Sequence, residues 1–351
     1  MDSRLLTIDD LVRLTGLEES LLRYYESEYG DALPEKILQG GVLYFAPASV
    51  TAFAAIHARN DTGALPQPVA ASRARVIAVT SGKGGVGKTN LALNLAVEWQ
   101  RLGKMTVVLD GDMGLANIHL LAGITPRHCL LDLMRGTAEL ADIIEAGPEG
   151  IGIIAGGNGL LSLADSSRQD RLRVIDALIE LEKAADIIVV DTGAGMGRGV
   201  RDFLMAADEI IFVITPDITS LTDAYGLLKG LHQENMPRRP LYLVVNMATT
   251  LKQAADAARR FVTCARDFLD RIVINSGYIL KDATVSLATA RRTPHAIYRP
   301  ESRVSKNTRA IACNLLRSET DRSRGSSSFG RYLNLIRAAR PGSLATERKT
   351  A

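Results

Sequence analysis

A glycine-rich turn between a short apolar segment and a leucine-rich segment constrains this chain more than any other feature. Residues 76–80 are uncharged and rich in β-branched side chains, which predicts a buried strand. The turn at residues 81–87 follows, and then a helix with leucines on its buried sides. Gly82 to Thr89 fits G-x-x-x-x-G-K-[ST], in which glycines let backbone N–H groups converge on phosphate at a helix N-terminus. The sequence therefore predicts a triphosphate site.

The motif assigns a role to each position of this loop. We expect Lys88 to reach the β- and γ-phosphates and the Thr89 hydroxyl to ligate Mg²⁺. A glycine turn without a ligand is the structural alternative, and the flanking strand and helix favour the ligand. The predicted nucleotide-binding residues are Gly82, Lys83, Gly84, Gly85, Val86, Gly87, Lys88, Thr89 and Asn90.

A second lysine, Lys83, occupies the second position of the motif and gives the loop the form KGGVGKT. This deviant form resembles the phosphate loop of the MinD/ParA family of dimerising ATPases. The resemblance implies ATP and Mg²⁺ as ligands, a homodimer when ATP is bound, and a catalytic Lys83 that crosses the interface to the partner's phosphates. The alternative is a solvated surface lysine, which would have nothing to do locally.

Two acidic motifs follow later predicted strands. Residues 106–109 precede DGDMGLANIHLLAG, which resembles the family's switch I segment, with His119 in place of its last acid. The resemblance implies that Asp112 orients the attacking water and that Asp110 supports the loop. Residues 187–191, IIVVD, have the Walker B arrangement, in which a buried strand ends in a carboxylate, Asp191, that holds a magnesium-bound water.

Further positions resemble contact residues of the family. DTGAGMG resembles switch II, which implies that the Gly193 amide senses the γ-phosphate. The strand at 242–246 ends in Asn246, which resembles the residue that contacts adenine in the family. Asp217 and Asp223 fit either a contact with the partner's nucleotide or positions at a helix start. A further strand is expected at 272–274. Asp282, which comes after it, matches a position near the base contacts of the family.

The alternation of strands and helices from residue 76 to about 317 predicts an α/β fold with a mostly parallel sheet and helices on both faces. Further strands are expected at 151–155 and 210–215, and a helix at 168–185. About 240 residues resemble the MinD/ParA family. Within it, GLANIHLLAG, LLDLMRG and DTGAGMGRGV look most like the flagellar-number regulators called FlhG or FleN. This likeness implies an FlhF-like GTPase, or flagellar or transcriptional regulators, as partners.

Residues 1–59 are expected to form a separate head. Thr7 and Asp10 predict a capping box at a helix that ends at Gly16, followed by a helix at 18–29, a hairpin at 37–44 and a helix at 46–58. This order predicts a winged helix-turn-helix, and the RYYE sequence that begins at Arg23 resembles the MerR family's DNA-binding head. Residues 1–60 carry nine acids and five bases, so protein docking and DNA binding both stay open.

Residues 60–75 read as a linker, 76–320 as the ATPase domain, and 321–351 as a flexible basic tail. A predicted amphipathic helix at 329–339 resembles the C-terminal membrane-targeting helix of MinD. The alternatives are that the helix packs on the ATPase domain or stays disordered, or that the basic tail binds DNA. The predicted membrane-binding residues, spaced i, i+3, i+4 and i+7, are Phe329, Tyr332, Leu333 and Ile336.

Composition places the chain among ordinary globular proteins, with 351 residues, 46% hydrophobic and 23% charged. No apolar run approaches the ~20 residues that span a bilayer, so we expect a cytoplasmic protein. The resemblance of the tail helix implies that this protein associates peripherally with the inner face of the cell membrane. The leading hypothesis is an ATP-dependent dimerisation switch that regulates flagellar number or placement, or a similar positioning task. The rivals are a ParA-type DNA-partition ATPase and a nucleotide-gated transcriptional regulator.

Overall fold

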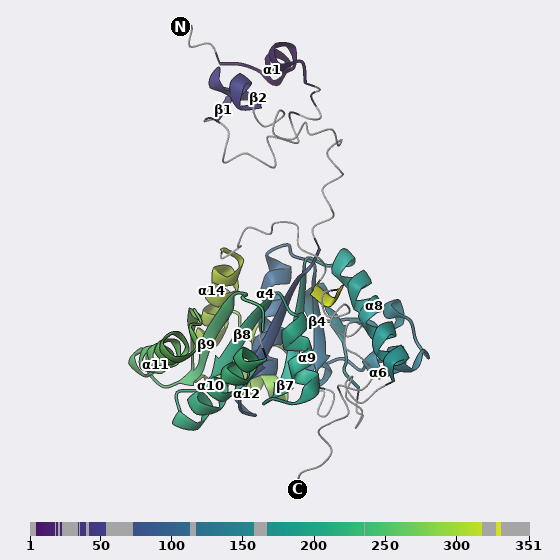
Figure 1. The fold of residues 1–351 in the computed structure, drawn as a ribbon, viewed down its shortest axis with the longest axis vertical. Coiled ribbons are helices and arrows are strands. Elements are labelled where there is room, and N and C mark those ends of the chain that lie inside the picture. The colour runs from purple at the N-terminus through teal and green to yellow at the C-terminus, as the bar shows by residue number, and fades with distance from the viewer. Residues whose placement is uncertain are drawn as a thin grey trace. The chain divides into compact units, whose positions relative to one another are not determined.

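The chain divides into two compact units, residues 1–71 and 72–351, each of which is described by itself (Figure 1). In this computed structural model the described residues are 5–17, 19, 22, 34, 36–39, 42–53, 73–112, 117–157, 167–234, 236–317 and 328–330.

The first unit contains the predicted capping box. Helix α1, Ile8–Thr15, begins after Thr7, whose backbone N–H donates to the Asp10 carboxylate at 3.0 Å, and Gly16 ends the helix with φ of 72°. Strands β1, Lys36–Gln39, and β2, Val42–Phe45, pair antiparallel as the hairpin pattern predicted. Residues 48–53 are helical, whereas the hairpin turn at 40–41 and most of the predicted second helix lie outside the described residues.

The described part of the second unit contains an eight-stranded sheet in the order β10-β9-β8-β3-β7-β4-β6-β5. All neighbouring strands run parallel except β5, which pairs antiparallel with β6, so the prediction of a mostly parallel sheet is confirmed. The strands are β3 Arg75–Ser81, β4 Thr106–Gly111, β5 Ile144–Ala146, β6 Gly152–Ile154, β7 Ile187–Ala194, β8 Glu209–Ile214, β9 Leu241–Ala248 and β10 Ile274–Leu280.

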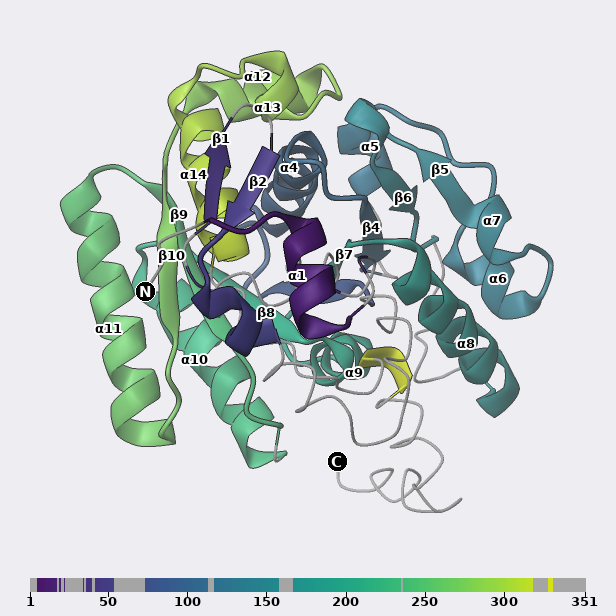
Figure 2. The same cartoon turned by 90° about the horizontal axis from the view of Figure 1, so that it is seen from above.

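Helices cover both faces of this sheet (Figure 2). Helices α4, Lys88–Arg101, and α14, Arg303–Arg317, pack on one face. The opposite face is covered by α8 Arg168–Ala184, α9 Arg198–Ala206, α10 Ile218–Gln233 and α11 Leu251–Leu269. The shorter helices are α5 Ile118–Ala122, α6 Leu130–Arg135, α7 Leu140–Ile143, a 3₁₀ turn at Pro148–Gly150, α12 Ala283–Ala290 and α13 His295–Tyr298.

Strand β3 shows why a run of apolar residues without alternation folds this way. Val76 and Ala78 belong to the core under α8 to α11, and Ile77 and Val79 to the core under α4 and α14. Both sets are fully buried, because a parallel strand between two helical layers has no solvent face. The glycine turn that is predicted to bind phosphate therefore follows a strand in the middle of the sheet.

Helix α4 is fixed to α14 by polar contacts as well as by packing. The indole N–H of Trp99 donates to the carbonyl oxygen of Ala312 at 3.1 Å. The guanidinium of Arg309 donates to the carboxylate of Glu98, which is 1% exposed, at 3.0 Å. These two contacts join the helix that follows the glycine turn to α14.

Several boundaries differ from the sequence predictions. The strand expected at 272–274 is wrong, since β10 begins at Ile274 and the Ile272 side chain is 80% exposed. Arg75, predicted to lie in the linker, is in β3, where its guanidinium pairs with the Glu209 carboxylate. The edge strand β5 was not predicted, because three residues leave too short a pattern to recognise.

Candidate nucleotide-binding site

Two glycines of the loop at residues 82–87 occupy positions where a side chain would be strained, Gly82 for lack of space and Gly87 because of its backbone conformation. A Cβ on Gly82 would lie 2.1 Å from the backbone carbonyl carbon of Asp223 in α10, so a helix packs directly against the loop. Gly87 has φ of 90° and forms the N-cap of α4. The side-chain amide of Asn246 donates to the Val86 carbonyl at 2.8 Å and braces the loop from behind. The cradle is therefore preformed at the carboxyl end of β3.

Lys88 is the first residue of α4 and is only 8% exposed. Burial lowers the pKa of its ammonium group, while the charges of Asp191 and Asp112 act in the opposite direction. A lysine held in this way is a cation without bulk solvent around it, so its attraction for an incoming phosphate is weakly screened.

Two carboxylates stand side by side behind the loop, because Asp110 in β4 and Asp191 in β7 are paired in register. Burial, with a contribution from mutual repulsion, raises the pKa of Asp191 to about 8, although the Thr89 hydroxyl donates a hydrogen bond to it. Burial also raises the pKa of Asp110 to about 7. The Asp191 Oδ1 atom is buried without a hydrogen-bond partner. A divalent cation would relieve this arrangement by supplying positive charge to an orphaned oxygen.

The donor set fits Mg²⁺ in particular. Thr89 and Asp191 are the two residues that would hold it, directly or through water, and phosphate oxygens would complete the shell. Among the described residues, no cluster of three or more His, Cys, Asp or Glu side chains could hold a metal ion alone.

The two predicted switch segments meet at Asp112. Its carboxyl carbon lies 3.6 Å from the point where a Cβ on Gly193 would stand, so β4 and β7 bring the predicted water-orienting acid beside the predicted γ-phosphate sensor. Asp110 supports the first segment, because its carboxylate accepts hydrogen bonds at 3.1 Å from the amides of both Asp112 and Ile118. Residues 113–116 lie outside the described residues.

Lys83 lies on the outer side of the loop. The sequence analysis expected this lysine to have no local partner, but the structure shows two. Its side chain is 45% exposed, and its ammonium group donates to the Thr219 hydroxyl at 2.8 Å and to the Asp217 carboxylate at 3.4 Å. Asp217 is the N-cap of α10, where it accepts a hydrogen bond from the Ser220 amide at 2.9 Å. Hydrogen bonds from Thr215 and Thr219 are the main reason why the Asp217 pKa is lowered.

Three predicted residues have structural contacts of their own. Asn246 uses both ends of its amide, since the Met247 amide donates to its oxygen at 2.8 Å. Asp282 is the N-cap of α12 and accepts from the Thr284 amide at 2.8 Å. Asp223 lies inside α10, and its backbone faces Gly82. Their roles as contacts of the base or of a partner's nucleotide stay predictions.

A cleft of about 410 Å³ opens beside the loop and includes residues that the sequence analysis missed. Met247, Thr249 and Gln253 line it opposite Lys83, and the Gln253 side chain accepts from the Thr249 amide at 2.8 Å. Met247 lies near the carboxyl end of β9, as Asn246 does, and Thr249 and Gln253 come shortly after that strand. Position at the carboxyl end of a parallel strand was therefore the signal that could have found them. The whole lining comprises Lys83, Gly84, Gly85, Val86, Thr215, Pro216, Asp217, Met247, Thr249 and Gln253.

The predicted membrane-binding residues are only partly described. Phe329 is 1% exposed and belongs to the core cluster beneath α8 to α11, so in this conformation its side chain is not available to lipid. Tyr332, Leu333 and Ile336 lie outside the described residues. Among the described residues, no helix has the length and apolar character needed to cross a bilayer.

Comparisons with known proteins agree with the motifs. Residues 74–236 match the family model described as an AAA domain, and residues 6–64 match that of the MerR HTH family regulatory proteins. The chain is 36% identical over 240 residues to the antiactivator FleN of Pseudomonas aeruginosa, covering 68% of this chain and 85% of FleN. It is also 36% identical over 196 residues to the flagellum site-determining protein YlxH of Helicobacter pylori, covering 55% of this chain and 65% of YlxH. Among solved structures, MinD of Pyrococcus horikoshii, complexed with Mg-ADP, matches with a TM-score of 0.57 at 24% identity, covering 70% of this chain and 98% of that one.

Proposed function

Because this chain belongs to the MinD/ParA family of P-loop ATPases, we propose that it works as a dimerisation switch driven by ATP. In the proposed cycle, ATP and Mg²⁺ bring two copies together at their phosphate loops, and hydrolysis separates them. The observation that carries this proposal is the placement of Lys83, a cation at the mouth of the loop whose side chain is turned outward, toward Asp217 and Thr219. A second copy facing the loop would meet this side chain directly.

The chain's own residues divide the chemistry between them. Lys88 and the loop amides bind the phosphates, and bound Mg²⁺ would supply positive charge that offsets the negative charge of the β- and γ-phosphates. Asp112, held beside Gly193, orients a water for attack on the γ-phosphate. The Lys83 of each copy neutralises charge on the other copy's nucleotide, as a positively charged finger does in related reactions.

Dimerisation can be tested without catalysis. Light scattering after gel filtration is expected to give one copy per particle without nucleotide and two copies with Mg²⁺ and a non-hydrolysable ATP analogue. Two copies per particle under both conditions would contradict a switch, and one copy per particle under both would contradict dimerisation. Turnover per copy should rise with protein concentration until the dimer saturates.

Replacing Asp112 with alanine is expected to lower ATP turnover at least ~100-fold, because no general base would then orient the water. The variant should still dimerise with ATP, since the loop, Lys83 and Lys88 are unchanged. Steady-state phosphate release and light scattering check the two halves of this expectation. A nucleotide-gated regulator that does not depend on hydrolysis would instead keep its regulatory output in this variant.

We further propose that the switch controls flagellar number or placement, or a similar positioning task, while reversibly attached to the inner face of the membrane. The names FleN and YlxH support the flagellar role, and the predicted helix at 329–339 supports the attachment. An FlhF-like GTPase or a flagellar transcriptional regulator is the proposed partner. Deletion of the gene is expected to change the number or position of flagella, and a deletion strain with normal flagella would contradict this role.

Lipid binding is expected to depend on the apolar stripe of the tail. Ile336→Asp should lower sedimentation of the ATP-bound protein with anionic vesicles about tenfold, because a charge would have to enter the interface. The matched control is Asn334→Asp, which adds the same charge off the stripe. Equal losses in both variants would point to simple charge repulsion, and no loss in either would contradict attachment through this helix.

The match to MerR regulators supports a second role, in DNA binding, for the head. Arg23 is the one base among four acids in the predicted recognition segment, so protein docking is a competing role for the same surface. Gel-shift titrations across salt concentrations distinguish them, because DNA binding must weaken steeply with salt. Salt-sensitive binding that survives removal of residues 321–351 would assign DNA to the head, and binding lost with that segment would favour the partition-type alternative.

A further inference from the structure

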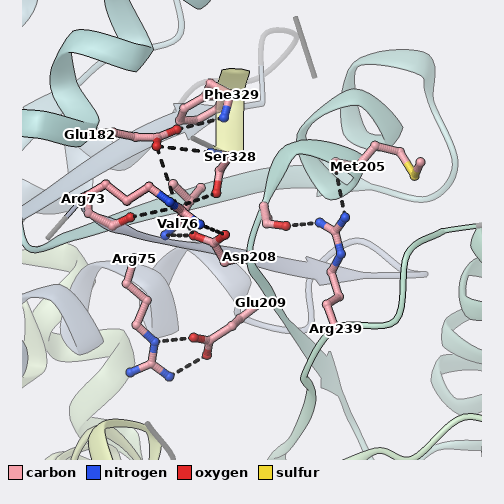
Figure 3. A network of polar contacts seen from close by, with 12 residues as sticks. Arg73, Arg75, Val76, Glu182, Met205, Asp208, Glu209, Arg239, Ser328 and Phe329 are labelled. Atoms are coloured by element: carbon pink, nitrogen blue, oxygen red, sulfur yellow. Dashed lines mark hydrogen bonds and ion pairs between the residues drawn. The ribbon is translucent and has the colours of Figure 1, made fainter. Parts of the chain in front are cut away.

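The described part of the tail, residues 328–330, is held by Glu182 of α8 and by Arg73, which lies just before β3 (Figure 3). The backbone amides of Ser328 and Phe329 donate to the carboxylate of Glu182 at 3.2 and 2.8 Å. The Phe329 ring is buried in the core beneath α8, and Ser328 is 0% exposed. Three consecutive residues, 328–330, are helical here.

The end of the linker is held at the same place. The Arg73 guanidinium forms two hydrogen bonds with the Asp208 carboxylate, at 2.8 and 2.7 Å, and donates to the Ser328 hydroxyl at 2.8 Å. The next residue, Ala74, donates its amide to the backbone carbonyl of Glu182 at 2.6 Å. We call the contacts of Arg73, Glu182, Asp208, Ser328 and Phe329 the clasp.

Glu182 is the centre of the clasp because it accepts from both segments. Its backbone carbonyl accepts a hydrogen bond from the Ala74 amide, and its carboxylate accepts from the Ser328 and Phe329 amides. The Arg73 guanidinium lies 3.7 Å from the same carboxylate. The side chain is 1% exposed, so a tail that left would strip a buried carboxylate of two donors. Movement of Arg73 would remove a hydrogen bond from Ser328 and a nearby positive charge from Glu182.

We propose that the clasp makes release of the tail depend on the position of the linker. A partner that binds the head and displaces Arg73 would weaken the hold on Ser328 and free Phe329. The predicted lipid-facing stripe includes Phe329, so a closed clasp and a complete stripe are mutually exclusive. Only this last consequence rests on the proposed attachment to membranes.

Hydrogen–deuterium exchange of the full-length protein tests the clasp directly. In Arg73→Ala, the amides of residues 328 and 329 are expected to exchange at least about tenfold faster than in the unaltered protein, because their shared acceptor is destabilised. The matched control is Arg238→Ala, which removes another arginine from an ion pair. The side chains of Arg238 and its partner Asp270 are 79% and 87% exposed. It should leave these amides unchanged.

A second variant keeps the test independent of folding. Ser328→Ala removes only the acceptor of Arg73 and leaves both tail amides in place, and it should speed their exchange about threefold. The double variant should be no faster than Arg73→Ala alone, because the two changes break one interaction. Additive effects, exchange in Arg73→Ala that matches the unaltered protein, or faster exchange throughout β3 and β7 would each overturn the proposal.

Vesicle sedimentation then separates the clasp from the proposed attachment. Nucleotide-free Arg73→Ala should bind anionic vesicles several-fold better than the unaltered protein. If exchange at residues 328 and 329 responds as expected but no variant binds vesicles, the clasp stands and the membrane role fails. If vesicle binding is strong and the exchange does not respond to Arg73, the membrane role stands and the clasp fails.

Discussion

Lys83→Ala is expected to lower ATP turnover about 1,000-fold while nucleotide affinity stays within about threefold. The reason is geometric, since the side chain is 45% exposed and turned toward Asp217 and Thr219 rather than into its own loop. Its contribution would come only when a second copy supplies the phosphates. Steady-state phosphate release and titration with a fluorescent ATP analogue measure the two quantities. Lys183→Ala, which removes an exposed lysine on α8, should change neither.

Mixing variants tests whether Lys83 acts across the interface. Neither Lys83→Ala nor Asp112→Ala should turn over ATP alone, but a mixed dimer would contain one complete site, with Asp112 from one copy and Lys83 from the other. Random pairing makes half of the dimers mixed, so about a quarter of normal activity should return. A mixture as inactive as its components would mean that Lys83 acts on its own nucleotide, and the dimer mechanism would be wrong.

Gly82→Ala is expected to destabilise the ATPase unit by about 3 kcal/mol and to abolish nucleotide binding. The added Cβ would stand 2.1 Å from the backbone of Asp223, and neither the loop nor α10 can yield without disturbing the sheet. Urea unfolding, with nucleotide titration of the remaining folded protein, measures both effects.

Gly84→Ala is the matched comparison for stability. It lies two residues further along the same loop, and a Cβ there would meet no atom within 4 Å. Its urea midpoint should stay within the error of the unaltered protein. If both alanine variants unfold at the same urea concentration, α10 does not constrain the loop as the structure indicates.

The fold of the ATPase unit and the centre of its site could be predicted from the sequence because their signals are local. An uncharged strand, a glycine turn and a leucine-rich helix follow one another between residues 76 and 96, and IIVVD ends in Asp191 within five residues. Each pattern lies within one or two elements, so neighbours in sequence carried the information.

What the sequence could not predict depends on elements far apart in the chain. Lys83 finds its partners 134 and 136 residues later, at Asp217 and Thr219, and no periodicity relates them. Phe329 fitted an amphipathic stripe equally well as a lipid contact or a core residue, and burial beneath α8 distinguishes the two in this conformation. The strand predicted at 272–274 was wrong because a short apolar run does not reveal which of its residues face solvent, and Ile272 does.

The contacts between α4 and α14 connect the helix at the predicted nucleotide site to the helix that leads into the tail. The Trp99 indole donates to the Ala312 carbonyl and the Glu98 carboxylate accepts from Arg309, so a movement of α4 that kept both contacts would carry α14 with it. Helix α14 ends at Arg317, and the chain continues from there toward the tail. Helix α14 is also joined to the sheet, because the Asn314 side chain donates to the Ser276 carbonyl of β10 at 3.4 Å, so the segment that leads to the tail starts from a helix anchored to both α4 and β10.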